Sequence, residues 1–233
     1  MSGGGTRDFQ PLWTRRKLMA GIAVAGSMVR SAFAAPLRPL PPVNEGDKDP
    51  QLQRFLTELK AIVTKRNAAA LLALMDPVFR VDFGGGKGPA AFTKQWHPAS
   101  ADSPVWKILE RLLELGGTFY TPTLFAMSYV YTKFPFDLDP FAFVVVTRDQ
   151  APLRPAPNAD AAPVATLQPS IVPVKPGLTA PVRLDQVSWL KVQVPDGPEG
   201  YVAAADVYSP AGYRAFFEKR GGKWRWISLA CAE

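Results

Sequence analysis

Apolar residues recur at helical spacing in two stretches of the first half of the chain. Asp49 before a proline is typical of a helix N-cap, and the first set follows three or four positions apart: Leu52, Phe55, Leu56, Leu59, Ile62 and Val63. Ser103, also before a proline, precedes the second set: Val105, Ile108, Leu109, Leu112 and Leu113. A glycine pair at 116–117 is typical of a helix C-terminus. The pattern predicts two amphipathic helices, and residues 68–74 either continue the first or form a further turn.

Downstream of Pro77 the pattern changes to the alternation of β-strands. From Val78 to Phe83, apolar side chains alternate with Arg80 and Asp82, which predicts a strand with one buried face. A Pro-rich region from 152 to 181 has no helical pattern. Further strand-like segments lie on either side of that region: Phe119–Tyr131, Phe141–Thr147, Trp189–Val194 and Gly200–Ala203.

Short motifs in the second half follow the order found in one family of small β-domains. They are Val144–Thr147, Leu153–Pro157, Val164–Leu167, Trp189–Val192, Asp196-Gly197 and Gly200–Val202. Residues 142–208 therefore resemble a bacterial SH3-type domain, although the Pro-rich excursion from 173 to 181 replaces the family's short loop. The resemblance implies a small SH3-like β-barrel, with Trp189 and Tyr201 as candidate ligand-binding residues.

The terminal segment, 209–233, contains a hairpin that a complete SH3-type barrel does not need. Arg214–Lys219 and Lys223–Leu229 flank a Gly-Gly turn. In one alternative the hairpin returns to the first half, and the SH3-like domain is an insertion. Two helices against an antiparallel sheet would then resemble the cystatin-like or ketosteroid-isomerase-like cone. In the other alternative two domains follow each other and the hairpin caps the barrel. Both alternatives predict an α+β fold.

The first 34 residues have the layout of an export signal. Arg15 and Arg16 precede a short, glycine-diluted apolar stretch, and small residues that end at Ala34 form a cleavage site. The stretch is too short to span a bilayer, which requires about 20 residues. The segment resembles a twin-arginine translocation signal, which implies a periplasmic protein. We expect residues 1–34 as signal, 35–50 as a Pro-rich tether, 51–141 as the first part of the α+β domain, 142–208 as the SH3-like domain and 209–233 as the hairpin.

Composition excludes several kinds of chemistry. The precursor has a net charge of +7, and removal of five basic residues and one acidic residue with the signal leaves +3. The basic charge is therefore partly a property of the signal, and we expect no nucleic-acid partner. Cys231 and His97 are the only residues of their types, so no disulfide forms within the chain and no Cys/His metal centre can be built. No cofactor motif is present, and no cofactor is expected.

Candidate catalytic residues are isolated in the sequence. The run Gly84–Gly88 lacks the Ser or Thr of a phosphate-binding loop and is interpreted as a turn between a strand and a helix. His97 with Ser100, Ser103 or Cys231 has no surrounding motif, and Asp82 shares its strand face with Arg80. Asp137 and Asp139 form an acidic pair too small to indicate calcium. The tryptophans Trp96, Trp106, Trp224 and Trp226 are expected in the core.

These observations favour an exported, cofactor-free binding or scaffold protein of the cell envelope. The SH3-type resemblance implies a target such as a peptidoglycan peptide or an envelope protein, and no stable transmembrane segment is expected. The alternative is a small-molecule binder or a cofactor-free enzyme that uses a cone-shaped cavity in the α+β domain. The sequence assigns no catalytic residue and no metal ligand.

Overall fold

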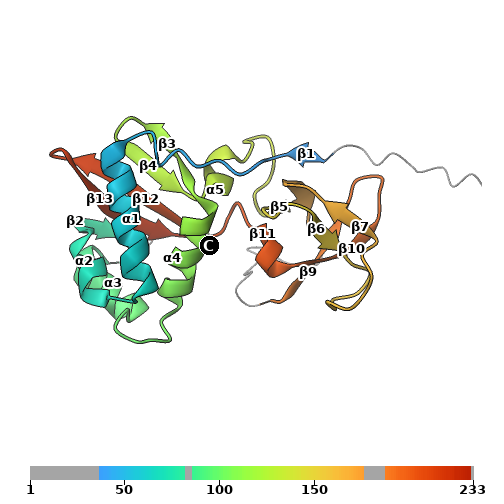
Figure 1. Ribbon diagram of the computed structural model, residues 1–233, viewed down its shortest axis with the longest axis horizontal. Helices are drawn as coiled ribbons and strands as arrows, with labels where there is room; N and C mark the ends of the chain where they lie inside the picture. Colours follow the sequence, from blue (N-terminus) through green and yellow to red (C-terminus); the bar gives the residue numbers. More distant parts are fainter. Residues whose placement is uncertain (1–36, 82–85, 176–186, 232–233) are drawn as a thin grey trace, which may run out of the picture. The chain divides into compact units, whose positions relative to one another are not determined.

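The computed structural model describes residues 37–81, 86–175 and 187–231, which belong to one compact unit. Its fold class is α+β, as predicted (Figure 1). The expected signal residues Arg15, Arg16 and Ala34, and also Asp82, lie outside the described residues. The structure contains an α+β part and a part built mainly from short strands.

The helices of the α+β part begin at side chains that satisfy free backbone amides. The Asp49 carboxylate accepts hydrogen bonds from the amides of Gln51 and Leu52, and Ser103 caps the second long helix. The helices are α1 (Pro50–Thr64), α2 (Ala68–Ala73), α3 (Gly88–Trp96), α4 (Pro104–Leu115) and α5 (Tyr129–Lys133). Gly116 ends α4 with a φ of 66°, as predicted. A helix after the glycine run was expected without bounds, and α3 is that helix. Helix α5 was not predicted, and it replaces the end of the expected strand Phe119–Tyr131.

A five-stranded sheet with the order β2-β13-β12-β4-β3 lies beside these helices. Its strands are β2 (Met75–Arg80), β3 (Gly117–Thr121), β4 (Leu124–Met127), β12 (Arg214–Arg220) and β13 (Lys223–Ala230). The terminal hairpin β12–β13 pairs with β4 on one side and with β2 on the other, the latter in parallel. This is the pairing that the insertion alternative predicts.

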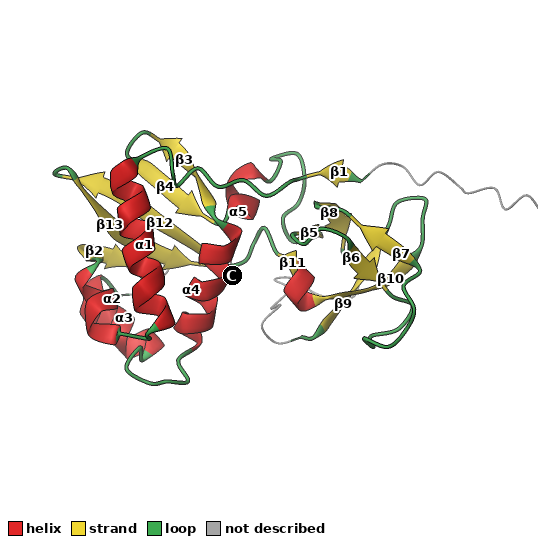
Figure 2. Ribbon diagram, in the orientation of Figure 1, coloured by secondary structure: helices red, strands yellow, loops and turns green. Residues whose placement is uncertain are grey.

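Helices α1 and α4 cover one face of this sheet (Figure 2). The core between these helices and the sheet is filled by large buried side chains, including Phe79, Phe217, Trp106 and Trp226. The Phe79 ring centroid lies 4.9 Å from that of Trp226 and 5.5 Å from that of Phe92. All four tryptophans expected in the core, Trp96, Trp106, Trp224 and Trp226, are buried.

The strand-rich part does not close into one barrel among the described residues. Its strands form three small sheets, with the orders β1-β8-β5-β11, β10-β9 and β6-β7. The strands are β1 (Arg38–Pro39), β5 (Phe143–Val146), β6 (Ala151–Leu153), β7 (Ala165–Leu167), β8 (Ser170–Pro173), β9 (Trp189–Gln193), β10 (Glu199–Ala203) and β11 (Val207–Tyr208). Alternate valines and leucines of these strands pack into one separate core. Single bridges between Arg154 and Tyr201 and between Val174 and Val192 join these sheets. In place of one continuous barrel, the described strands form three short, bridged sheets around a shared core.

The described end of the expected tether packs against the rest of the unit. Strand β1 pairs with β8, and Leu40 is buried. Further along, the Glu45 amide donates a hydrogen bond to the Gly117 carbonyl, and the Glu45 carboxylate accepts one from the Phe119 amide. The prolines keep this segment extended, so its backbone can pair with the edge of β8.

Candidate functional site

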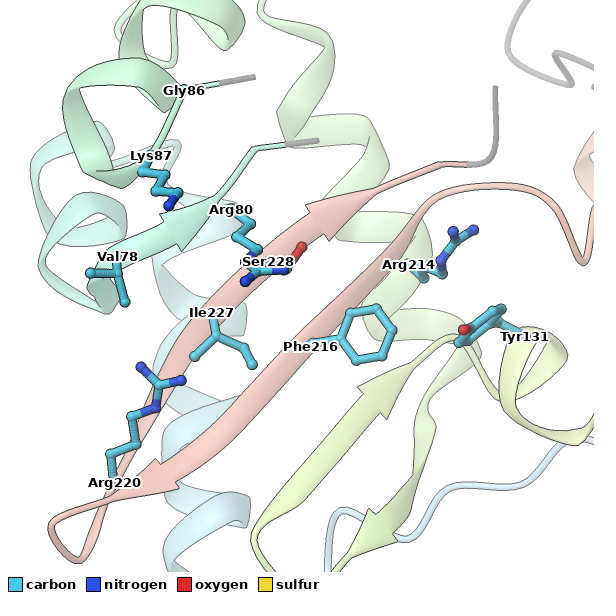
Figure 3. Close-up of a pocket in the computed structure, with 10 residues that line it drawn as sticks. All are labelled: Val78, Arg80, Gly86, Lys87, Tyr131, Arg214, Phe216, Arg220, Ile227 and Ser228. Atoms are coloured by element: carbon cyan, nitrogen blue, oxygen red, sulfur yellow. The ribbon is translucent and has the colours of Figure 1, made fainter. Parts of the chain in front are cut away.

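A pocket of about 670 Å3 lies on the face of the five-stranded sheet that points away from α1 (Figure 3). Three strands, the start of α3 and helix α5 contribute to it. Its lining residues are Val78, Arg80, Gly86, Lys87, Tyr131, Arg214, Phe216, Arg220, Ile227 and Ser228. We call this site the cationic pocket.

Strand alternation directs the lining side chains away from the helices. On β12, Ala215 and Phe217 are fully buried toward the helices, so Phe216 between them faces the pocket. On β13, the pairing register shifts between Trp226 and Ser228. Such an irregularity breaks the strict alternation, and Ile227 and Ser228 both line the pocket although they are neighbours in sequence.

A glycine brings Lys87 to the edge of the pocket. Gly88, the first residue of α3, has a φ of 79°, and a Cβ atom at this position would lie 2.8 Å from the Pro77 carbonyl oxygen. This close approach holds the start of α3 against β2, where Lys87 and Arg80 form an antiparallel bridge. The conformation and the space both require glycine.

Four of the lining side chains are cationic, and the described lining includes no carboxylate. Arg80 and Lys87 are exposed, whereas Arg214 is buried with 7% of its surface accessible. At the rim, Arg220 forms ion pairs with Glu218 at 2.5 Å and with Asp76 at 3.0 Å. The hydrogen bond to Glu218, together with the charge of Asp76, raises the pKa of Arg220. The pocket therefore gathers four cationic side chains above an apolar floor of Val78, Ile227 and Phe216, and the two carboxylates at the rim compensate the charge of Arg220.

Aromatic rings form the other side of the pocket. The Phe216 ring centroid lies 5.8 Å from that of Tyr131 and 6.3 Å from that of Tyr120. The Arg214 guanidinium carbon lies 4.7 Å from the Tyr131 ring centroid, within the range of a cation–π contact. Burial, followed by a hydrogen bond with Tyr131, raises the pKa of Tyr120. Tyr120 therefore stays neutral at physiological pH and presents its ring and its hydroxyl group.

The two ligand-binding residues proposed from the sequence share one surface in the strand-rich part. Trp189 pairs with Ala203, and Tyr201 pairs with Lys191 on the neighbouring strand. Trp189 and Tyr201 are thus diagonal neighbours on one half-buried face, whereas Leu190, Val192 and Val202 are buried on the other. The Lys191 ammonium lies 5.7 Å from the Tyr201 ring centroid. We call this surface the β9–β10 face.

The ion pairs of Glu199 occupy the edge of the β9–β10 face. Its carboxylate contacts the ammonium groups of Lys175 and Lys191. Hydrogen bonds from Lys175 and then Lys191 lower the pKa of Glu199 to about 2. The face is therefore polar at one end and aromatic at the other.

The other candidate catalytic groups have structural roles where they are described. His97 is an exposed residue at the C-terminal end of α3, and the Ser103 hydroxyl donates a hydrogen bond to the Trp96 carbonyl. Asp137 pairs with Arg38, and Asp139 accepts a hydrogen bond from the Phe141 amide. Within the described ranges, no three His, Cys, Asp or Glu side chains are grouped as metal ligands.

Comparisons with known proteins leave the family of this chain open. No protein-family model matches it, and no curated protein matches it. One solved structure, whose title contains the name Rd1NTF2_05, is 12% identical and covers 76% of this chain and 93% of its own, with a TM-score of 0.25. This likeness is too weak to carry an argument. In the part of the chain that the structure describes, none of the helices has the length and apolar character needed to cross a membrane.

The cationic pocket was not predicted from the sequence. Of its lining residues, Arg80 was singled out as part of a polar strand face, and Gly86 and Lys87 belong to the glycine run that was interpreted as a turn. The clearest available signal was the spacing of Arg214, Phe216 and Arg220, which places all three on one face of a strand whose other face begins with Ala215 and Phe217. Their position next to β2 depends on a pairing between segments that are far apart in the sequence.

Proposed function

We propose that this protein is a cell-envelope binding module that holds a small organic anion in the cationic pocket. The observation that carries the proposal is the joint placement of Arg80, Lys87, Arg214 and Arg220 around an apolar floor. Like charges that line one pocket repel each other, and an anionic ligand reduces that repulsion. Charge-assisted hydrogen bonds from guanidinium and ammonium groups to a carboxylate or phosphate are strong and directional.

The size and the lining of the pocket support a small organic ligand. A volume of about 670 Å3 lies within the range of roughly 300–1,000 Å3 that small-molecule sites occupy. Val78, Ile227 and Phe216 provide apolar contact that a purely inorganic ion would leave unused. The described lining contains cations, apolar groups, a serine and a tyrosine, which suits binding better than general acid–base catalysis near neutral pH.

The export signal supports a site of action in the periplasm. Arg15 and Arg16 before the short apolar stretch place the protein on the twin-arginine route in this proposal. Replacement of both arginines by lysine is expected to leave the precursor in the cytoplasm. Normal export of that variant would contradict the proposed route without affecting the proposed pocket.

The binding proposal is tested by NMR-detected titration of the mature protein with hexanoate, citrate, inorganic phosphate and the neutral hexanamide. We expect the anions to perturb the signals of the sheet's open face, and hexanamide to leave them unchanged. The variant Arg80→Gln/Lys87→Gln should weaken anion binding about tenfold, since it removes two charge-assisted contacts. The control Lys60→Gln/Lys107→Gln removes two exposed charges from α1 and α4 and should bind as the wild type does. Equal binding by both double variants, or no binding of any anion, would overturn the proposal.

A second candidate function rests on the β9–β10 face. The shared half-buried position of Trp189 and Tyr201 supports binding of a cell-wall peptide or an envelope protein at this surface. Aromatic side chains at such positions offer an apolar body and a polar edge to a partner. This function is compatible with the first, since the two surfaces belong to different sheets.

A further inference from the structure

Charge and aromatic character are unevenly distributed across the cationic pocket. Figure 3 shows Val78, Arg80 and Lys87 at one side, Phe216 and Tyr131 at the other, and Ile227 and Ser228 between them. The first side belongs to β2 and the start of α3, and the second belongs to β12 and α5. A ligand that contacts both sides meets Arg80 and Lys87 at one end. At the other end it meets the rings of Phe216 and Tyr131, with the Arg214 guanidinium against the Tyr131 ring.

The sheet order gives the spacing between the two sides. Strands β2 and β12 are separated by β13 alone. Neighbouring strands lie about 4.8 Å apart, so the two sides are about 10 Å apart. A compact anion such as phosphate cannot contact both sides, whereas an elongated organic anion can.

The aromatic side offers surface for a ring. Phe216 is only partly buried, and Tyr120 beside it is 47% exposed. The ring planes of Phe216 and Tyr131 meet at 82°, and this edge-to-face contact fixes the orientation of the Phe216 ring. Aromatic pairs in such arrangements contribute about 1 kcal/mol beyond the burial of apolar area.

We infer that the ligand is an amphipathic anion, with a carboxylate or phosphate held at Arg80 and Lys87 and a planar ring about 10 Å away against Phe216. The inference rests on the proposed function and specifies its ligand class. A second copy of this chain is a poor occupant, because it would bring another Arg80 and Lys87 against the same two cations. A ligand with opposite charge at one end and apolar character at the other complements both sides.

The test is a length series of phenylacetate, 4-phenylbutyrate and 6-phenylhexanoate, compared with hexanoate and inorganic phosphate. We expect affinity to rise along the series, and 6-phenylhexanoate to bind about tenfold more tightly than hexanoate. In Phe216→Leu, which keeps an apolar side chain but removes the ring, that ratio should fall to about twofold. The control Phe136→Leu changes a fully exposed phenylalanine and should keep the wild-type ratio.

Two outcomes overturn the inference while leaving the proposed function intact. One is binding of hexanoate or phosphate as tightly as the phenyl compounds. The other is an unchanged ratio in Phe216→Leu, with thermal unfolding showing that the variant is folded. Failure of every anion to bind would instead overturn the proposed function itself, so the two failures are distinguishable.

Discussion

The Arg220 guanidinium lies 3.0 Å from the Asp76 carboxylate, although the two residues are 144 positions apart in the sequence. Asp76 is buried, and its carboxylate also accepts a hydrogen bond from the Val78 amide. The pair therefore connects the rim of the cationic pocket to the start of β2, and it compensates part of the pocket's positive charge.

Replacement of Asp76 by asparagine is expected to strengthen anion binding. Asparagine can keep the hydrogen bond from the Val78 amide, but it removes the negative charge beside Arg220. We expect hexanoate to bind a few-fold more tightly at low salt, and the gain to shrink as salt screens the charges. The free energy of unfolding should fall by about 1 kcal/mol, because a hydrogen bond between charged groups at a half-exposed rim is weakened. Weaker binding by the folded variant would contradict the electrostatic account.

Replacement of Gly88 by alanine tests how Lys87 reaches the pocket. The added Cβ would lie 2.8 Å from the Pro77 carbonyl oxygen, and the positive φ disfavours any side chain. We expect a loss of stability of about 2 kcal/mol and weaker hexanoate binding, because the start of α3 must move away from β2. Gly222 is a matched control, since its φ is 75° and nothing lies within 4 Å of its added Cβ. Chemical denaturation should show that Gly222→Ala lowers the free energy of unfolding by less than Gly88→Ala does. The hexanoate affinity of Gly222→Ala should equal that of the wild type.

Asp49 gives the stability a dependence on acidic pH. Burial raises its pKa, but hydrogen bonds from the Leu52 amide, Lys219 and the Gln51 amide outweigh burial and leave the pKa below its usual value. A carboxyl group whose pKa is lowered in the folded state stabilises the fold at pH values above its unfolded pKa of about 3.9. That contribution disappears as the pH falls through the folded pKa. Asp49→Asn keeps a capping oxygen but loses the ion pair with Lys219.

Urea denaturation of wild type and Asp49→Asn measures this contribution. We expect the variant to be about 1 kcal/mol less stable near pH 7, and the difference to disappear as the pH falls below about 4. Asp49→Ala should be less stable than Asp49→Asn at both pH values, because it also removes the cap of α1. A difference between wild type and Asp49→Asn that stays constant with pH would assign the effect to something other than the charge of Asp49.

The β9–β10 face predicts retention on purified peptidoglycan. Tyr201→Ala should reduce retention several-fold, because it removes the ring that lies beside the Lys191 ammonium. Phe136→Ala is a suitable control, since it removes a fully exposed aromatic ring outside the β9–β10 face. Thermal unfolding must show both variants folded. Failure of the folded wild type to bind would remove the cell-wall target and leave the cationic pocket as the candidate site.

The elements predicted correctly are those whose local pattern agrees with their final surroundings. Helices α1 and α4 have caps and a continuous apolar stripe, and the hairpin β12–β13 has a Gly-Gly turn between alternating strands. The bounds of helix α3 were not predicted because it follows a glycine run and carries only Phe92 and Trp96 as large buried anchors. Helix α5 was missed because aromatic and β-branched residues between Tyr129 and Lys133 favour strands locally.

The cationic pocket could not be predicted because its parts are ordinary when considered separately. Arg80 and Arg220 each resemble a charged residue on a solvated strand face. They line one pocket only because β13 pairs with β2 in parallel, a pairing between segments about 150 residues apart. Local sequence gives the face on which each side chain lies, and long-range pairing gives its neighbours.

That long-range pairing leads to a prediction about fragments. Strand β13 lies between β2 and β12, so a fragment of residues 35–141 lacks the two strands that join β2 to β4. The fragment also loses Phe217, Trp224, Trp226 and Leu229 from the core beneath α1 and α4. Each buried side chain of this size contributes about 2 kcal/mol, and the loss of four exceeds what a domain of this size can tolerate.

We therefore expect residues 35–141 alone to unfold without a cooperative transition, as measured by circular dichroism during urea titration. Addition of a synthetic hairpin peptide of residues 209–233 should restore cooperativity, because it supplies both strands and the missing core residues. A peptide with Trp226→Ala and Phe217→Ala keeps the turn but lacks two core side chains, and it should not restore folding. Cooperative unfolding of the 35–141 fragment without any peptide would show that the hairpin is dispensable, and would contradict the role that the strand order gives to β13.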